Sequence, residues 1–166
     1  MLSAFTLSFP NPVNERAARV VAAGVAALST LTIALQLRWL SLALAAGFLL
    51  RVLWGPRFSP LGLLATRVIA PRLPWAPRLV AAPPKRFAQA IGLTFAAAAG
   101  LLFYAFDLAS AGYAVLGALL AAALLESALG ICLGCRAFAL LMRAGLVPDE
   151  VCERCADITL GAPASR

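Results

Sequence analysis

Two pairs of cysteines near the end of the chain are the residues most able to do chemistry. Cys132 and Cys135 form one C-x2-C motif, and Cys152 and Cys155 form a second one sixteen residues later. This spacing suits four thiolates that together bind zinc or an iron-sulfur cluster. Each pair alone also suits a dithiol that forms and breaks a disulfide. Inert cysteines that pack as small apolar residues are the third alternative, which the paired spacing disfavours.

The two pairs differ in the charges around them. Arg136 and Arg143 flank the first pair, whereas acidic residues surround the second, namely Asp149, Glu150, Glu153 and Asp157. A thiolate is favoured beside cations and disfavoured beside carboxylates. If the pairs exchange disulfides, we therefore predict that the nucleophile belongs to the first pair.

The chain lacks the residues that several other catalytic chemistries need. The chain has no histidine, which excludes a Ser-His-Asp triad, a Cys-His pair, mixed Cys/His zinc sites and His-ligated haem. It also has no G-x-x-x-x-G-K-[ST] loop, so chemistry driven by a nucleotide would need a partner protein. Thiol chemistry and thiolate-metal binding are the classes of function that remain.

Most of the chain before the cysteines has the composition of transmembrane helices. Apolar residues make up 63% of the chain and charged residues 13%, with a mean hydropathy of +0.92, which is far from the balance of a soluble domain. A helix needs about 20 apolar residues to cross the hydrocarbon of a bilayer. Four stretches approach that length, at residues 20–37, 39–54, 88–106 and 109–131. We therefore predict an all-α membrane protein with four transmembrane helices in a single membrane domain over residues 1–166.

Two segments lie outside the predicted spans. Residues 55–87 contain seven prolines and no acidic residue, which predicts a proline-rich loop at the membrane interface. A short helix should start at Ser59-Pro60 and stop at Pro71. Residues 132–158 form the predicted cysteine-bearing tail. Before the first span, Asn14 is the expected N-cap of its helix.

The cations are distributed unevenly between the two sides that four spans would create. Arg38 falls on one side, and the other thirteen cations fall on the opposite side: Arg16, Arg19, Arg51, Arg57, Arg67, Arg72, Arg78, Lys85, Arg86, Arg136, Arg143, Arg154 and Arg166. Positively charged loops stay in the cytoplasm. We therefore expect a multi-pass protein of the plasma (inner) membrane with both termini, the 55–87 loop and all four cysteines in the cytoplasm. Contact with the lipid bilayer then accounts for the pI near 10.3 without a nucleic-acid partner.

Arg51 and Glu126 are charged residues within the predicted spans. A carboxylate in a span costs roughly a few kcal/mol and is usually paired. Because both residues lie near the cytoplasmic ends of their spans, we predict a structural ion pair between Arg51 and Glu126. The alternative is that Glu126 carries protons for Cys132, about six residues or about 9 Å further along the same helix, although that offset puts the two residues on different faces.

Small residues are frequent in the third and fourth spans, as in residues 96–100 and at Gly112, Gly117 and Ala121. Small side chains let helices approach closely. We interpret them as positions of internal packing, with a homodimer as the alternative.

Several short motifs, in their order along the chain, resemble those of a known family. They are Pro12-Val13-Asn14-Glu15, Phe58-Ser59-Pro60-Leu61 through Ala70-Pro71-Arg72, Pro84-Lys85-Arg86-Phe87-Ala88-Gln89, and Leu125-Glu126 leading into Cys132-Leu133-Gly134-Cys135. The chain thereby resembles the uncharacterised bacterial membrane proteins catalogued as domain of unknown function 4395. The resemblance implies a small four-helix membrane protein without an assigned reaction. It also implies a soluble partner that is thioredoxin-like or a sulfurtransferase, because such proteins are encoded beside the family's members.

Two functions of different class fit these residues. The first is a membrane-tethered thiol-disulfide or sulfur-handling protein in which Cys132, Cys135, Cys152 and Cys155 react with a soluble thiol partner. The second is a noncatalytic membrane module in which the same four cysteines bind zinc or an iron-sulfur cluster and so position a partner-binding tail. The sequence leaves open whether the protein is an enzyme and whether it holds a cofactor.

Overall fold

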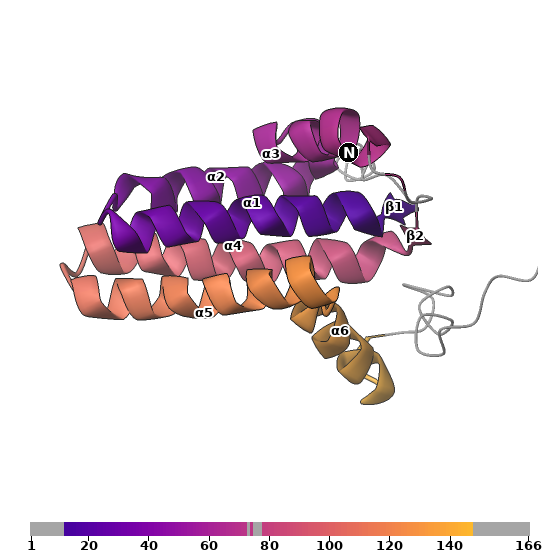
Figure 1. The fold of residues 1–166 in the computed structure, drawn as a ribbon. Coiled ribbons are helices and arrows are strands. Elements are labelled where there is room, and N and C mark those ends of the chain that lie inside the picture. Colours follow the sequence, from indigo (N-terminus) through magenta and orange to yellow (C-terminus); the bar gives the residue numbers. More distant parts are fainter. Residues whose placement is uncertain (1–11, 73, 75–77, 148–166) are drawn as a thin grey trace, which may run out of the picture.

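Four antiparallel helices form a bundle. The computed structural model describes residues 12–72, 74 and 78–147 of the chain. The bundle helices are α1 (Glu15–Ala34), α2 (Trp39–Trp54), α4 (Ala82–Tyr104) and α5 (Ala109–Leu129). Helix α1 packs against α2 and α5, and α4 also packs against α2 and α5, so that the four helices close around one core (Figure 1).

Three of the four bundle helices are long and apolar enough to cross a membrane. These are α1, α4 and α5, with 20, 23 and 21 residues. Helix α2 is equally apolar but has 16 residues, or about 24 Å at about 1.5 Å per residue. Its bounds match the predicted helix at 39–54, but its length falls short of the hydrocarbon thickness of about 30 Å.

Two helices begin earlier than predicted. The first starts at Glu15 rather than near residue 20, because Asn14 is its N-cap, as predicted, and accepts a 3.0 Å hydrogen bond from the backbone N–H of Arg16. Helix α4 starts at Ala82 rather than near residue 88. Pro83 and Pro84 fit in its first turn, where a backbone N–H has no helical partner to lose.

The connection between α2 and α4 is a helical layer followed by a small β-ribbon. Helix α3 (Pro60–Leu63) runs directly into a π-helical segment, η3 (Leu64–Ile69), and a 3-10 turn, η4 (Ala70–Arg72). The layer contacts α1, and α3 also contacts α2. The predicted short helix is therefore present, but the helical path continues through Pro71 instead of stopping there.

The β-ribbon joins the start of the described chain to the start of α4. Strand β1 (Val13–Asn14) pairs antiparallel with β2 (Leu79–Val80). Next to it, the Glu15 carboxylate and the Arg78 guanidinium form a 3.0 Å ion pair. The ribbon thus fixes where α1 and α4 begin relative to one another.

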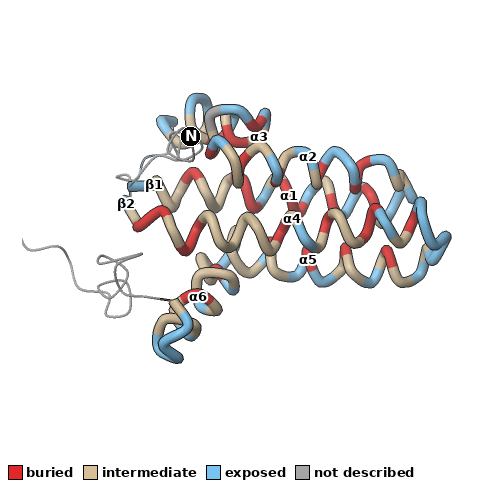
Figure 2. Tube along the Cα trace, turned by 180° about the vertical axis from the view of Figure 1, so that it is seen from behind, coloured by how far each residue is buried: buried red, intermediate tan, exposed pale blue. Residues whose placement is uncertain are grey.

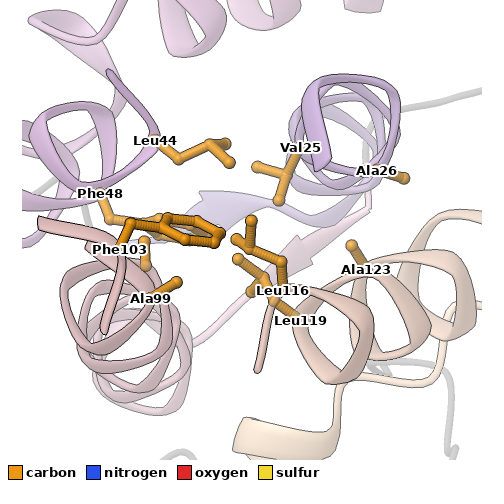
Figure 3. Close-up of a cluster of buried hydrophobic side chains, with 10 residues drawn as sticks. Val25, Ala26, Leu44, Phe48, Ala99, Phe103, Leu116, Leu119 and Ala123 are labelled. Atoms are coloured by element: carbon orange, nitrogen blue, oxygen red, sulfur yellow. The ribbon is translucent and has the colours of Figure 1, made fainter. Parts of the chain in front are cut away.

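The core of the bundle is built from large apolar side chains and glycines that make room for them. Leu44, Phe48, Phe103 and Leu116 are almost fully buried at the centre (Figure 3). The Phe48 ring lies against Gly92, where an added Cβ would overlap it, and the Phe103 ring lies against Gly112 in the same way. Internal packing is therefore confirmed for Ala96, Ala99, Gly100 and Gly112, which are buried, but not for Gly117, which has open space beside it, or for Ala121, which is exposed.

The outer faces of the bundle are apolar as well. Large side chains are exposed on every bundle helix, among them Leu31, Leu42, Leu49, Leu101 and Leu124, all at 44% exposure or more (Figure 2). Such a surface is unfavourable in water and suits lipid. The fold is consistent with a membrane protein.

The two ends of the bundle differ in charge. The α1–α2 and α4–α5 connections lie at one end, and the β-ribbon, the α3–η4 layer and α6 (Leu133–Arg143) lie toward the other (Figure 1). Of the described cations, Arg38 alone lies at the first end, where it forms an exposed 3.6 Å ion pair with Asp107. The predicted asymmetry of cations is therefore a feature of the folded bundle.

Candidate functional site: a dithiol at the start of α6

The first cysteine pair lies where α6 leaves the bundle. Helix α5 ends at Leu129, and Gly130 adopts the left-handed conformation (φ 70°) that turns the chain. The predicted continuation of that helix to residue 131 is therefore wrong, and Cys132 is not on the helix that carries Glu126. Instead, Cys132 is the N-cap of α6.

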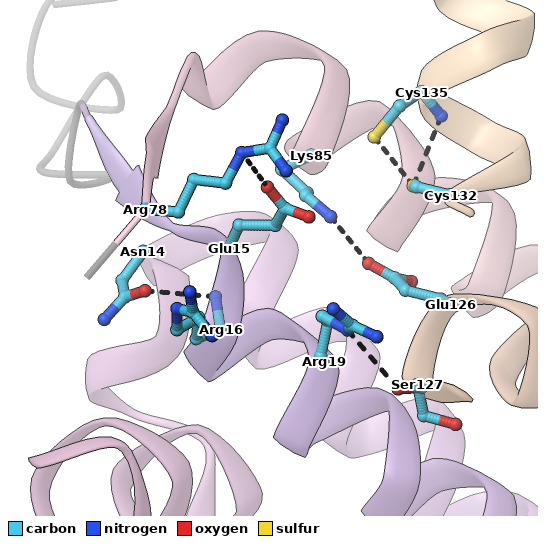
Figure 4. Close-up of polar contacts among 10 residues, drawn as sticks. All are labelled: Asn14, Glu15, Arg16, Arg19, Arg78, Lys85, Glu126, Ser127, Cys132 and Cys135. Atoms are coloured by element: carbon cyan, nitrogen blue, oxygen red, sulfur yellow. Dashed lines mark hydrogen bonds and ion pairs between the residues drawn. The ribbon is translucent and has the colours of Figure 1, made fainter. Parts of the chain in front are cut away.

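An arginine from α1 holds this turn in place. Arg19 donates hydrogen bonds to the carbonyl oxygens of Ser127 (Nε, 3.3 Å) and Ala128 (Nη2, 2.8 Å), as Figure 4 shows in part. These carbonyls are among the last of α5 and have no helical N–H partner. A cation is also favoured at a helix C-terminus. Arg19 thus ties α1 to the segment that presents the cysteines.

A glycine between the two cysteines lets α6 approach α4. A Cβ at Gly134 would lie 2.6 Å from both the Cα and the Cβ of Ala88. That distance is far below a van der Waals contact, and a backbone atom cannot rotate away as a side chain can. The C-L-G-C motif therefore has two roles: its glycine allows α6 to pack against α4, and its cysteines supply the two thiols.

The two sulfurs are in direct contact. The Cys132 sulfur accepts hydrogen bonds from the backbone N–H of Cys135 (3.3 Å) and from its thiol, with a sulfur-sulfur distance of 2.7 Å (Figure 4). A disulfide bond is about 2.05 Å long, so a small movement would join them. Cys132 is 9% exposed and Cys135 is partly exposed.

This geometry makes the two thiols unequal. The hydrogen bond from Cys135 lowers the pKa of the Cys132 thiol, helped by the nearby Lys85 ammonium and opposed by burial and by Glu126. The pKa of the Cys135 thiol is raised, because its proton is held by the Cys132 sulfur and because the group is buried. Cys132 is therefore the thiolate-forming member of the pair.

The carboxylate beside the dithiol is paired with a different cation from the one predicted. Lys85 Nζ lies 2.7 Å from Glu126 Oε1, and both side chains are largely buried, at 9% and 18% exposure. The predicted ion pair between Arg51 and Glu126 is wrong. Arg51 instead donates to Gln89 Oε1 (2.8 Å) and Ser59 Oγ (2.9 Å).

The physical reason lies in the order of the helices. Helices α2 and α5 each pack mainly against α1 and α4, so Arg51 on α2 is not the neighbour of Glu126 on α5. The early start of α4 places Lys85 in its first turns, facing α5. The two members of this pair act oppositely on both cysteines: the Lys85 ammonium lowers the pKa of each thiol, and the Glu126 carboxylate raises it.

The sequence of the chain matches that of a known family over most of its length. The model of the family described as Domain of unknown function (DUF4395) matches residues 13–143. The chain belongs to this family. The DUF4395 match, which confirms the predicted resemblance, runs from β1 to the last residue of α6 and therefore contains the first cysteine pair and not the second. No curated protein and no solved structure matches the chain.

A cleft of about 620 Å³ opens in front of the dithiol of this DUF4395 protein. Both cysteines line it, together with the acidic Glu15, which pairs with Arg78, and an excess of cations: Arg78, Lys85, Arg136 and Arg143. Its apolar wall includes Ala81 and Phe138, which form a small buried cluster between the β-ribbon and α6. The cleft can therefore admit an extended group to the sulfurs, and its charge favours an anionic one.

The second cysteine pair lies outside the described residues. The prediction that Cys152 and Cys155 join Cys132 and Cys135 around one metal, zinc or an iron-sulfur cluster, stays a prediction for that reason. Within residues 12–147 as described, no three His, Cys, Asp or Glu side chains are grouped so that they could hold a metal ion. A metal at this site would need ligands from the second pair.

The unequal thiols predict how alkylation depends on pH. In the Cys152→Ser/Cys155→Ser background, iodoacetamide should label Cys132 first, with a rate midpoint below that of an ordinary cysteine, because the thiolate persists to lower pH. Cys135→Ala removes the hydrogen-bond donor and should shift the midpoint of Cys132 alkylation to higher pH. Cys135→Ser keeps a hydroxyl donor and should shift this midpoint less. Mass spectrometry of labelled peptides over a pH series measures this. A midpoint unchanged by Cys135→Ala would contradict the assignment.

Proposed function

We propose that this is a multi-pass protein of the plasma membrane whose Cys132–Cys135 dithiol exchanges disulfides or sulfur with a soluble thiol protein, thioredoxin-like or a sulfurtransferase. The observation that carries the proposal is the contact between the two sulfurs at the start of α6, with Cys132 accepting from the backbone and the thiol of Cys135. A helix N-terminus and a neighbouring donor both favour a thiolate. That is what a nucleophilic cysteine needs.

The orientation of the protein is part of the proposal. We place the end of the bundle with α6 in the cytoplasm, since nearly all described cations lie toward it and positive segments stay inside. Helix α2 then serves as the fourth span, and local thinning of the bilayer or snorkelling of the flanking arginines compensates for its length. Both termini and all four cysteines would face the cytoplasm, where soluble thiol proteins are present.

The exchange itself follows from the two thiols. The Cys132 thiolate attacks a sulfur of the partner's disulfide, which forms a mixed disulfide and releases one partner thiolate. Cys135 then attacks the Cys132 sulfur, its proton passes to a partner thiolate, and the second partner sulfur leaves. The Cys132–Cys135 dithiol is thereby oxidised by two electrons and the partner disulfide is reduced. We assign Cys152 and Cys155 to the return step, in which their dithiol reduces the Cys132–Cys135 disulfide by the same exchange and becomes a disulfide itself. A second soluble dithiol then reduces the Cys152–Cys155 disulfide and is oxidised in turn.

A four-thiolate metal module is the alternative, and the spacing of the two C-x2-C motifs is what favours it. In that case all four thiolates would be bound to zinc or an iron-sulfur cluster, and the tail would be held against α6 without catalysing a reaction.

The metal content and the free thiols of the purified protein separate the two functions. We expect no stoichiometric zinc or iron by elemental analysis, and four thiols that react after mild reduction without a chelator. One zinc per chain, with thiols that react only after chelation, would instead establish the metal module. A Cys152→Ser variant provides the control, because it would release a metal held by four thiolates but would leave the reactivity of Cys132 in place.

A further inference from the structure

A second cavity lies at the same end of the bundle, on the side of the α3–η4 layer. It measures about 480 Å³ and lies where β1 and α1 meet the last turn of α2, segment η3 and the first turns of α4. Its polar lining consists of amides, a hydroxyl and cations: Asn14, Arg51, Thr66, Arg67, Lys85 and Gln89. None of the described residues that line this cavity is acidic.

Arg51 is a buried cation whose partners are neutral. Its residue is 3% exposed, its Nε and Nη1 donate to the uncharged Gln89 and Ser59, and its guanidinium carbon lies 4.4 Å from the centroid of the Phe48 ring. The remaining nitrogen, Nη2, has no hydrogen-bond partner among the described residues. A buried charged donor without a partner is unfavourable, and an anion next to it would remove that cost.

Other lining groups add donors and positive charge. Gln89 uses its Oε1 to accept from Arg51, which leaves its amino group to donate. Arg67 is exposed at the cavity and forms no ion pair with a described residue, whereas the charge of Lys85 is balanced by Glu126. Within the part of the chain that the structure describes, two arginines therefore have no counter-charge around this cavity.

We propose that this cavity binds a phosphate-type oxyanion, with Arg51 and Arg67 as its charged ligands. Guanidinium groups match the oxygens of such anions through two parallel hydrogen bonds. Inorganic phosphate and the headgroup of an anionic phospholipid share this chemistry. Neither the metal module nor the thiol exchange requires such a site, so the proposal stands apart from both.

The test uses the full-length protein, delipidated in a neutral detergent, and its thermal melting midpoint. Inorganic phosphate is titrated against chloride at equal ionic strength, and phosphatidylglycerol is titrated against phosphatidylcholine in mixed micelles. We expect a saturable rise in the midpoint with phosphate or with phosphatidylglycerol. Arg67→Gln should weaken this binding roughly tenfold, and Arg67→Lys should restore part of the affinity. Arg72→Gln is the matched control, because Arg72 is exposed on the next helical segment and does not line the cavity.

The outcomes distinguish the source of the anion. A saturable rise in the melting midpoint with inorganic phosphate would show that a small free anion is enough to occupy the cavity. A saturable rise with phosphatidylglycerol alone would identify the ligand as a lipid headgroup. The proposal is wrong if neither probe gives a saturable response. It is also wrong if Arg67→Gln and Arg72→Gln change the response equally, since that would reflect general screening of surface charge.

Discussion

Glu126→Gln should lower the free energy of unfolding by about 3 kcal/mol, because it leaves the Lys85 ammonium buried without its counter-charge. Lys85→Met should cost a similar amount by leaving the Glu126 carboxylate unpaired. The double variant Lys85→Met/Glu126→Leu removes both charges and should cost less than either single variant. Unfolding curves in detergent measure all three. Equal costs for the single and double variants would show that the two residues do not act as a pair.

The same variants should change the reactivity of the dithiol in opposite directions. Lys85→Met removes a cation and should raise the pKa of the Cys132 thiol, which slows its alkylation near neutral pH. Glu126→Gln removes an anion and should lower that pKa, which speeds alkylation. Both variants are destabilising, and a general loosening of the fold would speed the alkylation of Cys132 in both. A slower rate in Lys85→Met together with a faster rate in Glu126→Gln would therefore exclude that explanation.

A second ion pair at the same end provides the matched control. Glu15 and Arg78 lie 3.0 Å apart and line the cleft, and the Glu15 side chain, at 14% exposure, is as buried as that of Glu126, but the Arg78 side chain is 67% exposed. Glu15→Gln leaves an exposed, hydrated cation behind, and an ion pair with such an exposed member contributes roughly 0 to 1 kcal/mol. Glu15→Gln should therefore leave stability nearly unchanged. A cost for Glu15→Gln as large as that for Glu126→Gln would contradict the argument from burial.

The sequence predicted those parts of the fold that depend on local signals. The bounds of α2, the start of α5 at Ala109 and the N-cap at Asn14 follow from runs of apolar residues and from a side chain that can cap a helix. The end of α5 at Leu129 could also have been predicted, since Gly130 is a typical residue to follow a helix. The predicted span ran to residue 131 instead, because the apolar run continues through Ile131.

The partner of Glu126 could not be predicted in the same way. Arg51 and Lys85 are both cations near the same end of the bundle, and nothing local in the sequence states which helix faces α5. The choice depends on the packing order of the helices and on the early start of α4, which brings Lys85 into a helix instead of a loop. The contact between Gly134 and Ala88 also depends on that packing, although the glycine itself was visible between the cysteines.

A chromogenic aromatic disulfide that releases a coloured thiolate shows whether Cys132 and Cys135 act together as a redox dithiol. In the Cys152→Ser/Cys155→Ser background, the Cys132 thiolate should release one coloured thiolate and become labelled, and Cys135 should at once displace the label. We therefore expect two released thiolates, no label on the protein and a Cys132–Cys135 disulfide. With Cys135→Ser added, we expect one released thiolate and a label that stays on Cys132. Stable labels on both cysteines of the unaltered pair, without a disulfide between them, would show that Cys132 and Cys135 do not act as a redox dithiol.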